Sequence, residues 1–419
     1  MESKRINLGG VLPQLPNEIL EEIFLRLPGV KTLVIQTAVC KLWNSLIKTS
    51  AFIEAHQKRN QHHHLLLIQA RAAVKVQGKG DTRHLFYLLC DKPPFKVYKS
   101  YYQRITHPFV AYDRLHATSP EEKIASIRKF DVMETCNGLV CLVASSNYTA
   151  LVWNPCIRKL VMPPRINTSR HEISKISHGF GYDSRTHDYK VVRIVRYLAW
   201  TGRKTSYEIW SLAQPSWKAL SVLPPVDDFR PSSRSIFVSG AVHWVHGRVH
   251  GIWMHEANPT IVSFDMSDEV FGEITMPQVM MIKSHRIISR YRNSLAVLQW
   301  DFVLDDAKQK QLDMWVMKEY GVVESWTKLL TVKLPEYIHS IRRLGFRNNG
   351  EALIRYVNHP RARKTSRHVQ KLLNPHSDDI GDFEAQGSRF LEYKLVEPFV
   401  ESLILLDHPS AISTNILKG

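Results

Sequence analysis

The chain has 419 residues and a formal net charge of +17, with 44% hydrophobic and 23% charged residues. This ordinary balance excludes a largely disordered chain, and the length predicts two domains or one large domain built from repeats. The five cysteines are odd in number and form no C-x-x-C pair, which excludes a small disulfide-stapled secreted scaffold and indicates reduced thiols.

No targeting or membrane segment is expected. The first residues lead into no long apolar core of the kind that a signal peptide needs. The longest apolar runs, such as Leu65–Ile68 and Leu403–Leu406, have the length of strands and are far too short for a helix that spans a bilayer. We therefore expect a soluble protein of the cytoplasm, the nucleus or both.

Residues 12–57 predict a helical unit. Leu15, Ile19 and Ile23 recur every four residues, which is the spacing of one face of a helix. Pro16 stands at the first helical position, and acidic residues follow it where the helix dipole favours negative charge. The first helix is therefore expected to begin at this proline.

Three further elements are expected before the first strands. Pro28-Gly29 breaks the first helix, and the apolar run from Val30 to Val39 predicts a second one. Lys41 to Ile47 is expected to form a third element, and Ser50 to cap a short turn after it.

This unit carries more apolar surface than it can bury alone. About 45 residues is near the lower limit for independent folding, yet the apolar residues occupy more than one face. One interpretation is that they pack on the downstream domain. The other is that they form a docking surface for the helices of a partner, with Trp43 as its aromatic anchor.

From residue 62 onward the sequence is typical of strands, and it repeats. Four short apolar strands align on their aromatic residues, Trp153, Trp210, Phe264 and Trp315, at steps of 57, 54 and 51 residues. Each has a further strand before and after it. A unit of this length with several strands cannot bury its own faces, so the repeat predicts the blades of a β-propeller.

About six blades are expected. Because closure of the ring removes exposed sheet edges, the first and last strands are expected to share one blade. Leu65–Gln69 and Leu85–Leu89 at the start, and Gly350–Arg355 and Phe399–Leu406 at the end, are the candidate strands. A β-sandwich with long insertions is the alternative.

Signatures of catalysis and of metal binding are absent from the sequence. It contains no G-x-S-x-G elbow, no H-E-x-x-H helix and no G-x-x-x-x-G-K-[ST] loop. The run His62–His64 cannot aim three side chains at one ion from a strand, because neighbours alternate between faces, and no cysteine pair is spaced for zinc. Cys136, Cys141 and Cys156 are expected to fill the core. We therefore expect no catalytic residue, no metal and no cofactor.

The positive charge is concentrated near the C-terminal end. Between Lys333 and Lys371, ten Lys and Arg residues face only two Glu residues, and the densest cluster comprises Arg361, Arg363, Lys364 and Arg367. Such a surface attracts polyanions or acidic proteins. No nucleic-acid-binding motif accompanies it, so a solvated basic loop is the favoured interpretation. A nucleic-acid-binding or scaffold protein with a propeller stays the alternative.

Two sets of motifs together resemble those of a known family. The first set runs from Leu15-Pro16-Asn17-Glu18-Ile19 to Leu27-Pro28 and resumes at Val39-Cys40-Lys41-Leu42-Trp43. The second set comprises Cys136–Leu142, Trp153–Lys159, Gly179–Asp183, Asp188–Val192 and Gly240–Trp244. Over nearly its whole length the chain resembles plant F-box proteins that carry an F-box-associated domain.

The resemblance implies a fold and a function. Members of that family are receptors of SCF-type ubiquitin ligases: the F-box binds the Skp adaptor and through it cullin, and the second domain selects a protein for ubiquitination and degradation. It implies an α+β multidomain protein, with a small all-α F-box at 12–57, a mainly-β, kelch-like propeller at 62–407 and no catalytic role. The residues that it assigns to adaptor binding are Leu15, Pro16, Ile19, Ile23, Leu27, Val39, Cys40 and Trp43.

The chain departs from the family pattern at two positions. Gly29 is inserted before Val30-Lys31-Thr32-Leu33, and Ile35 stands where the family often has arginine. The first turn is therefore expected to be longer, and the affinity for the adaptor to differ.

Some stretches also resemble a subgroup of the family. Ile261–Pro277, Asp313–Val332 and Phe399–Asp407 are most similar to S-locus F-box proteins, which recognise the ribonucleases of self-incompatibility. The Arg361–Arg367 cluster has no counterpart in that subgroup. The sequence does not identify the substrate or the pathway.

Overall fold

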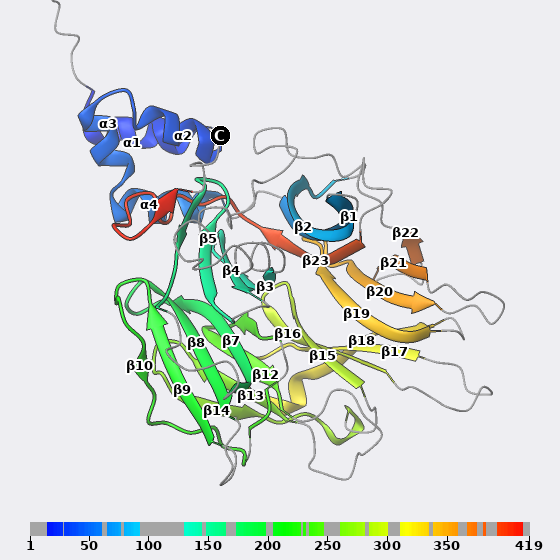
Figure 1. Cartoon of the computed structure of the whole chain (residues 1–419). Helices are drawn as coiled ribbons and strands as arrows, with labels where there is room; N and C mark the ends of the chain where they lie inside the picture. Colours follow the sequence, from blue (N-terminus) through cyan, green and yellow to red (C-terminus); the bar gives the residue numbers. More distant parts are fainter. Residues whose placement is uncertain are drawn as a thin grey trace, which may run out of the picture.

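A computed structural model gives the fold, in which a group of helices stands at one corner of a ring of sheets (Figure 1). The structure describes residues 15–27, 29–60, 65–76, 79–92, 130–144, 148–164, 173–197, 204–227, 229–231, 234–246, 260–280, 285–300, 311–334, 338–358, 367–374, 380–382 and 392–413.

Four helices precede the sheets: α1 (Asn17–Leu25), α2 (Val30–Gln36), α3 (Lys41–Ile47) and α4 (Ser50–Arg59). The third element predicted from the sequence, residues 41–47, is confirmed. No helix in the described ranges is long and apolar enough to cross a membrane.

Two predictions about the helix boundaries were wrong. Pro16 lies just outside α1, as its N-cap residue. Thr49, not Ser50, caps the last helix: its hydroxyl accepts a hydrogen bond from the backbone N–H of Phe52 at 3.2 Å. With that cap the chain forms a helix of ten residues instead of a short turn.

The strands form six sheets within the described part of the chain, and we call these sheets blades 1 to 6. Blade 1 has β3 (Phe130–Cys136), β4 (Leu139–Ala144), β5 (Ala150–Asn154) and β6 (Lys159–Val161), and blade 2 has β7 (Ile173–Asp183), β8 (Asp188–Tyr197), β9 (Lys204–Ser211) and β10 (Lys218–Ala219). Blade 3 has β11 (Ile236–Val238), β12 (Ala241–Val245), β13 (Ile261–Asp265) and β14 (Phe271–Ile274). Blade 4 has β15 (His285–Tyr291), β16 (Ser294–Trp300), β17 (Gln311–Met317) and β18 (Trp326–Lys333), and blade 5 has β19 (Ile338–Phe346), β20 (Ala352–Asn358), β21 (Arg367–Leu373) and β22 (Ile380–Asp382).

Blade 6 closes the ring. It combines β1 (Leu65–Val76) and β2 (Lys79–Cys90) from the start of the sheet region with β23 (Glu392–Phe399) from its end. β1 pairs with β23 in antiparallel register, Leu65 opposite Phe399. The propeller of six blades, with first and last strands in one blade, is therefore confirmed, and the sandwich alternative is wrong.

The expected last strand, Phe399–Leu406, was placed too late. The chain leaves blade 6 after Phe399, and Leu405 has φ +74°, which no strand residue adopts. Residues 400–413 cross to blade 1 instead, where β24 (Ile412–Ser413) pairs with β6.

The aromatic repeat has a packing cause. All four residues lie on the third strand of a blade, and each fills the interface with the preceding blade. Trp153 on β5 meets Phe86 of blade 6 edge to face, with 5.5 Å between the ring centroids. Phe264 on β13 packs with Val192 of blade 2. The period of the sequence is thus the period of the blade contacts.

Candidate functional site

The inner face of helices α1–α3 belongs to the core of the whole protein. Leu20, Phe24, Leu33 and Ile47 are buried in one continuous apolar cluster with residues of blades 1 and 6, among them Trp153. The helices are therefore not an independent unit, and for this face the first interpretation, packing on the downstream domain, holds.

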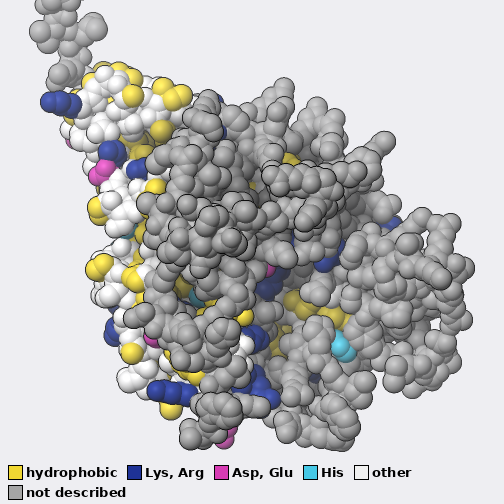
Figure 2. Space-filling model, viewed as in Figure 1, with side chains coloured by type: hydrophobic (Ala, Val, Ile, Leu, Met, Phe, Trp, Pro, Cys, Tyr) yellow, Lys and Arg dark blue, Asp and Glu magenta, His cyan; other side chains and the backbone are white. Residues whose placement is uncertain are grey.

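The outer face of the same helices is apolar and uncovered in this chain. Among the described residues nine large hydrophobic side chains are exposed, and five of them lie on this short N-terminal stretch. Exposed apolar side chains gathered on one short stretch are typical of a site where another protein binds. We call it the outer ridge, and Figure 2 shows hydrophobic atoms gathered on these helices. Its residues are Leu15 (49% exposed), Ile19 (49%), Ile23 (42%), Ile35 (57%) and Val39 (58%).

The structure separates the eight residues named from the sequence into two groups. Leu15, Ile19, Ile23 and Val39 lie on the outer ridge, and Pro16 and Cys40 are exposed beside it. Leu27 and Trp43 are half-buried and pack against the inner cluster.

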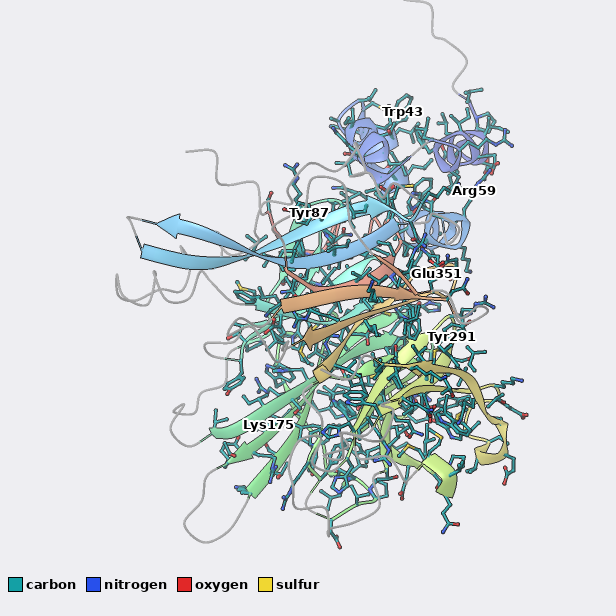
Figure 3. All side chains as sticks on the ribbon, turned by 90° about the vertical axis from the view of Figure 1, so that its right-hand side faces the viewer. Trp43, Arg59, Tyr87, Lys175, Tyr291 and Glu351 are labelled. Carbon is teal, nitrogen blue, oxygen red and sulfur yellow. The ribbon has the colours of Figure 1, made fainter. Side chains whose placement is uncertain are left out.

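Trp43 joins the two faces of the helical unit. Its ring packs edge to face on Phe24, with centroids 5.0 Å apart, while part of it stays accessible from outside. Figure 3 shows Trp43 among the helices at the end of the molecule, with Arg59 on α4 nearer the propeller. Cys40 sets the start of α3, because its Sγ accepts the N–H of Trp43 at 3.5 Å.

The sequence did not assign Ile35 to this surface. The signal was its apolar side chain at a position where the resemblance expects arginine. An exposed isoleucine there extends the apolar area onto α2.

Charged groups border the ridge. Glu22 on α1 accepts hydrogen bonds from Arg59 (3.2 Å) and Arg26 (2.9 Å), which lower the pKa of its carboxyl group. Because Arg59 belongs to α4, this cluster also links the first and last helices. An apolar centre with a polar rim is the usual anatomy of a protein–protein interface.

Among the described residues no group of three His, Cys, Asp or Glu could hold a metal. His178 is buried in β7, where burial and then Arg193 lower its pKa to about 3, so it is a neutral core histidine. Cys136, Cys141 and Cys156 are buried as expected.

Several residues singled out in the sequence lie outside the described ranges: His62–His64, Arg361, Arg363 and Lys364. Arg367, the last residue of the basic cluster, begins β21.

Comparison with known sequences decides the family. Residues 100–402 match the family model for the F-box associated beta propeller domain, and residues 12–53 match the F-box-like model. The chain belongs to the F-box-associated β-propeller family. The resemblance seen in the sequence motifs is thereby confirmed at the level of the family, while none of these matches reports on the S-locus subgroup.

Relatives of this F-box protein are found in a plant. An F-box/kelch-repeat protein of Arabidopsis thaliana is 28% identical over 327 residues, covering 76% of this chain and 79% of the relative. The F-box protein CPR1 of the same species is 29% identical over 354 residues, covering 78% and 75%. Among solved structures, a levansucrase of B. megaterium aligns with a TM-score of 0.33 at 10% identity over 64% of this chain and 84% of that one, a likeness too low to bear on function.

Proposed function

We propose that this F-box protein is the non-catalytic substrate receptor of an SCF ubiquitin ligase. Residues 12–57 bind the Skp adaptor through the outer ridge, and the propeller, residues 62–407, holds the protein to be ubiquitinated. The observation that carries the proposal is the pair of faces on α1–α3: one is anchored in the protein's own core, and the other presents exposed Leu, Ile and Val side chains.

The free energy available at the ridge offsets much of the cost of forming a complex. Full burial of a Leu or Ile side chain contributes about 1.5–3 kcal/mol, and these side chains, which are 42–58% exposed, have about half of that still to gain. Summed over the five residues, this is roughly 4–8 kcal/mol, which is comparable to the lower estimates of the cost of association. The ridge therefore favours a partner with a complementary apolar groove.

The proposed mechanism is proximity. A target held by the propeller stays near a charged ubiquitin-conjugating enzyme, which raises the effective concentration of its lysines. No group of this chain needs to take part in the chemistry. We place this activity in the cytoplasm or the nucleus.

The test is a double substitution on the ridge, Ile19→Ala with Val39→Ala, assayed by titration with purified Skp adaptor. Both side chains are about half exposed, so the fold should keep its melting temperature. We expect the two changes together to weaken binding by about 2 kcal/mol. Leu223→Ala, a change at an exposed residue (72%) of the propeller, is the matched control. Equal affinities of the double variant and the wild type would contradict the proposal.

A self-incompatibility ribonuclease is the first substrate that we propose to test, because Ile261–Pro277, Asp313–Val332 and Phe399–Asp407 resemble S-locus F-box proteins. Binding of such a ribonuclease should survive the ridge substitutions, since the propeller is unchanged in them. A ribonuclease that binds neither the wild type nor the variant would remove this substrate and leave the adaptor proposal untouched.

A further inference from the structure

The segment that follows the last blade strand contacts both parts of the protein. We call residues Glu401–Ser413 the C-terminal clamp. It is the red segment beside α4 in Figure 1, between the helices and blade 1. The match to the propeller family ends at residue 402, so nearly all of the clamp lies beyond the matched domain.

The clamp is fixed to blade 1 by polar contacts. The Asn154 side chain donates from Nδ2 to the carbonyl oxygens of Ser402 (2.9 Å) and Ile404 (2.7 Å). Lys159 Nζ donates to the carbonyl oxygen of Leu406 at 2.6 Å, and β24 extends the sheet beyond β6. These bonds hold the clamp backbone in place along the edge of the blade.

Gly138, in the turn between β3 and β4, makes room for the clamp. It has φ +79°, and a Cβ atom there would overlap the Cβ of Ser402 and lie 2.7 Å from the carbonyl oxygen of Val400. Only glycine fits both the backbone conformation and this close approach. Gly138 and Asn154 belong to the motifs that resemble the family, so part of that family signature serves to bind the clamp.

On the other side, the clamp holds the helices through a buried carboxylate. Glu401 is 1% exposed, and its Oε2 accepts the N–H of Val30, the first residue of α2, at 3.1 Å. Gly29 lies directly beside it with φ +75°, and a Cβ at Gly29 would stand 3.3 Å from the same oxygen. The inserted glycine therefore leaves the space that the Glu401 carboxylate needs to reach the N–H of Val30.

Further contacts of the clamp reinforce this junction. Leu403 and Leu406 are buried in the same cluster as Leu33 and Ile47 of the helices. Lys48, at the end of α3, pairs with Asp407 at 2.8 Å. Helix α4 has a separate contact with the propeller, where the Gln57 side chain lies close to the hydroxyl of Tyr189 on β8.

We propose that the C-terminal clamp sets the orientation of the outer ridge relative to the propeller, with Glu401 as the positioning residue that acts through α2. The inference deepens the proposed function, because this orientation would fix the distance from the bound adaptor to the bound substrate. The contacts themselves do not depend on what the ridge binds.

Four variants test the contact between Glu401 and α2: one removes it, one keeps it, one is a control elsewhere in the clamp, and one disturbs it from the side of Gly29. Glu401→Ala removes the acceptor of the Val30 N–H, whereas Glu401→Gln keeps an acceptor oxygen at the same place. Asp407→Asn breaks only the exposed end of the clamp, where the Asp407 side chain is 63% exposed. Gly29→Ala, which presses a methyl group on the Glu401 carboxylate, approaches the contact from the other side.

The first measurement is amide hydrogen exchange in peptides from α2 and, for reference, from β13 in blade 3. In Glu401→Ala we expect α2 to exchange roughly tenfold faster or more, with β13 unchanged. Glu401→Gln should stay close to the wild type, as should Asp407→Asn. A merely structural role of Glu401 would speed exchange in both peptides, which would overturn the inference.

The second measurement is the distance distribution between spin labels at position 18 on α1 and position 223 in the propeller, in a Cys40→Ser, Cys90→Ser background. We expect one narrow distribution for the wild type and for Glu401→Gln, and a broad one for Glu401→Ala. Should Glu401→Ala fail to fold, Gly29→Ala takes its place with the same expectation. A distance distribution of Glu401→Ala, or of Gly29→Ala in its place, that is as narrow as that of the wild type would contradict the proposed role of the clamp.

Addition of purified adaptor separates the two proposals. We expect Glu401→Ala to bind it within about threefold of the wild type, because the ridge residues are intact, and to keep its broad distribution in the complex. If wild-type protein binds no adaptor, the proposed function fails, while the exchange and distance data still decide on the clamp.

Discussion

At the scale of the residue, Trp43 differs from its neighbours on the ridge. Ile19 and Val39 project outward, whereas Trp43 lies on Phe24 and takes part in both surfaces. Its replacement therefore acts on folding as well as on binding.

We expect Trp43→Ala to lower the free energy of unfolding by about 2 kcal/mol, less than a fully buried tryptophan would, because the ring is only half-buried. Urea titration followed by circular dichroism measures it. Trp43→Phe should recover most of the loss because it keeps an edge-to-face contact. An unfolding midpoint of Trp43→Ala equal to that of the wild type would show that the contact with Phe24 contributes nothing.

Asp183 shows what many of the family motifs do. Its buried carboxylate accepts the backbone N–H groups of Arg185 and Thr186 and the hydroxyl of Ser267, and it pairs with Lys190 at 2.8 Å. Burial alone would raise its pKa, but these bonds hold it well below the usual range. Since Ser267 follows β13, the motif joins blade 2 to blade 3.

At the scale of the element, the inner strands are tied by charged side chains. Glu134 on β3 accepts the N–H of Phe237 on β11 at 2.9 Å. Arg290 on β15 reaches Thr135 on β3 at 3.3 Å and Glu397 on β23 at 3.9 Å. Strands from four blades thus meet around one group of buried charges.

This group predicts a dependence of stability on pH. Burial raises the pKa of Glu134 from 4.5 to about 7, with Arg290 opposing the rise and Glu397 adding to it. Between those values the folded protein binds more protons than the unfolded chain, so the contribution of this residue to stability falls as the pH rises.

We expect Glu134→Gln to gain about 1–3 kcal/mol relative to the wild type when the pH is raised from about 5 to about 8. Urea unfolding curves at several pH values measure the difference. Parallel pH profiles of the two proteins would contradict it. Glu269→Gln, at an ion-paired position whose pKa is lowered, is a control that should show no gain in this window.

The sequence was sufficient to predict the elements that have a strong local signal. The limits of α3 and the blade repeat follow from periodicity and from aromatic residues at fixed spacing. The clamp could not be predicted, because Leu403–Leu406 has the composition of a strand while its backbone is held by the distant Asn154. Likewise, Ile19 and Leu20 are both apolar, and only tertiary contacts determine which one faces the partner.

At the scale of the whole molecule, the charge of +17 keeps the nucleic-acid alternative open to test. Among the residues whose side chains the structure describes, Tyr320 is the one exposed Phe, Trp or Tyr, so these residues present no row of exposed rings on which bases could stack.

We expect single-stranded nucleic acid to bind no more tightly than about 10⁻⁶ M at physiological salt, the range of non-specific binding. Fluorescence anisotropy over a series of salt concentrations measures it. Tight binding that falls steeply with salt and is unchanged by Ile19→Ala with Val39→Ala would favour the alternative.

Because Glu401, Leu403 and Leu406 complete the core under the N-terminal helices, these helices are synthesised well before the residues on which they pack. We expect a nascent chain that stops before residue 401 to lack a finished F-box, so that ribosome-stalled fragments capture adaptor poorly until residues 401–406 have emerged. Copies that terminate before this point would then not occupy adaptor molecules needed by folded ones.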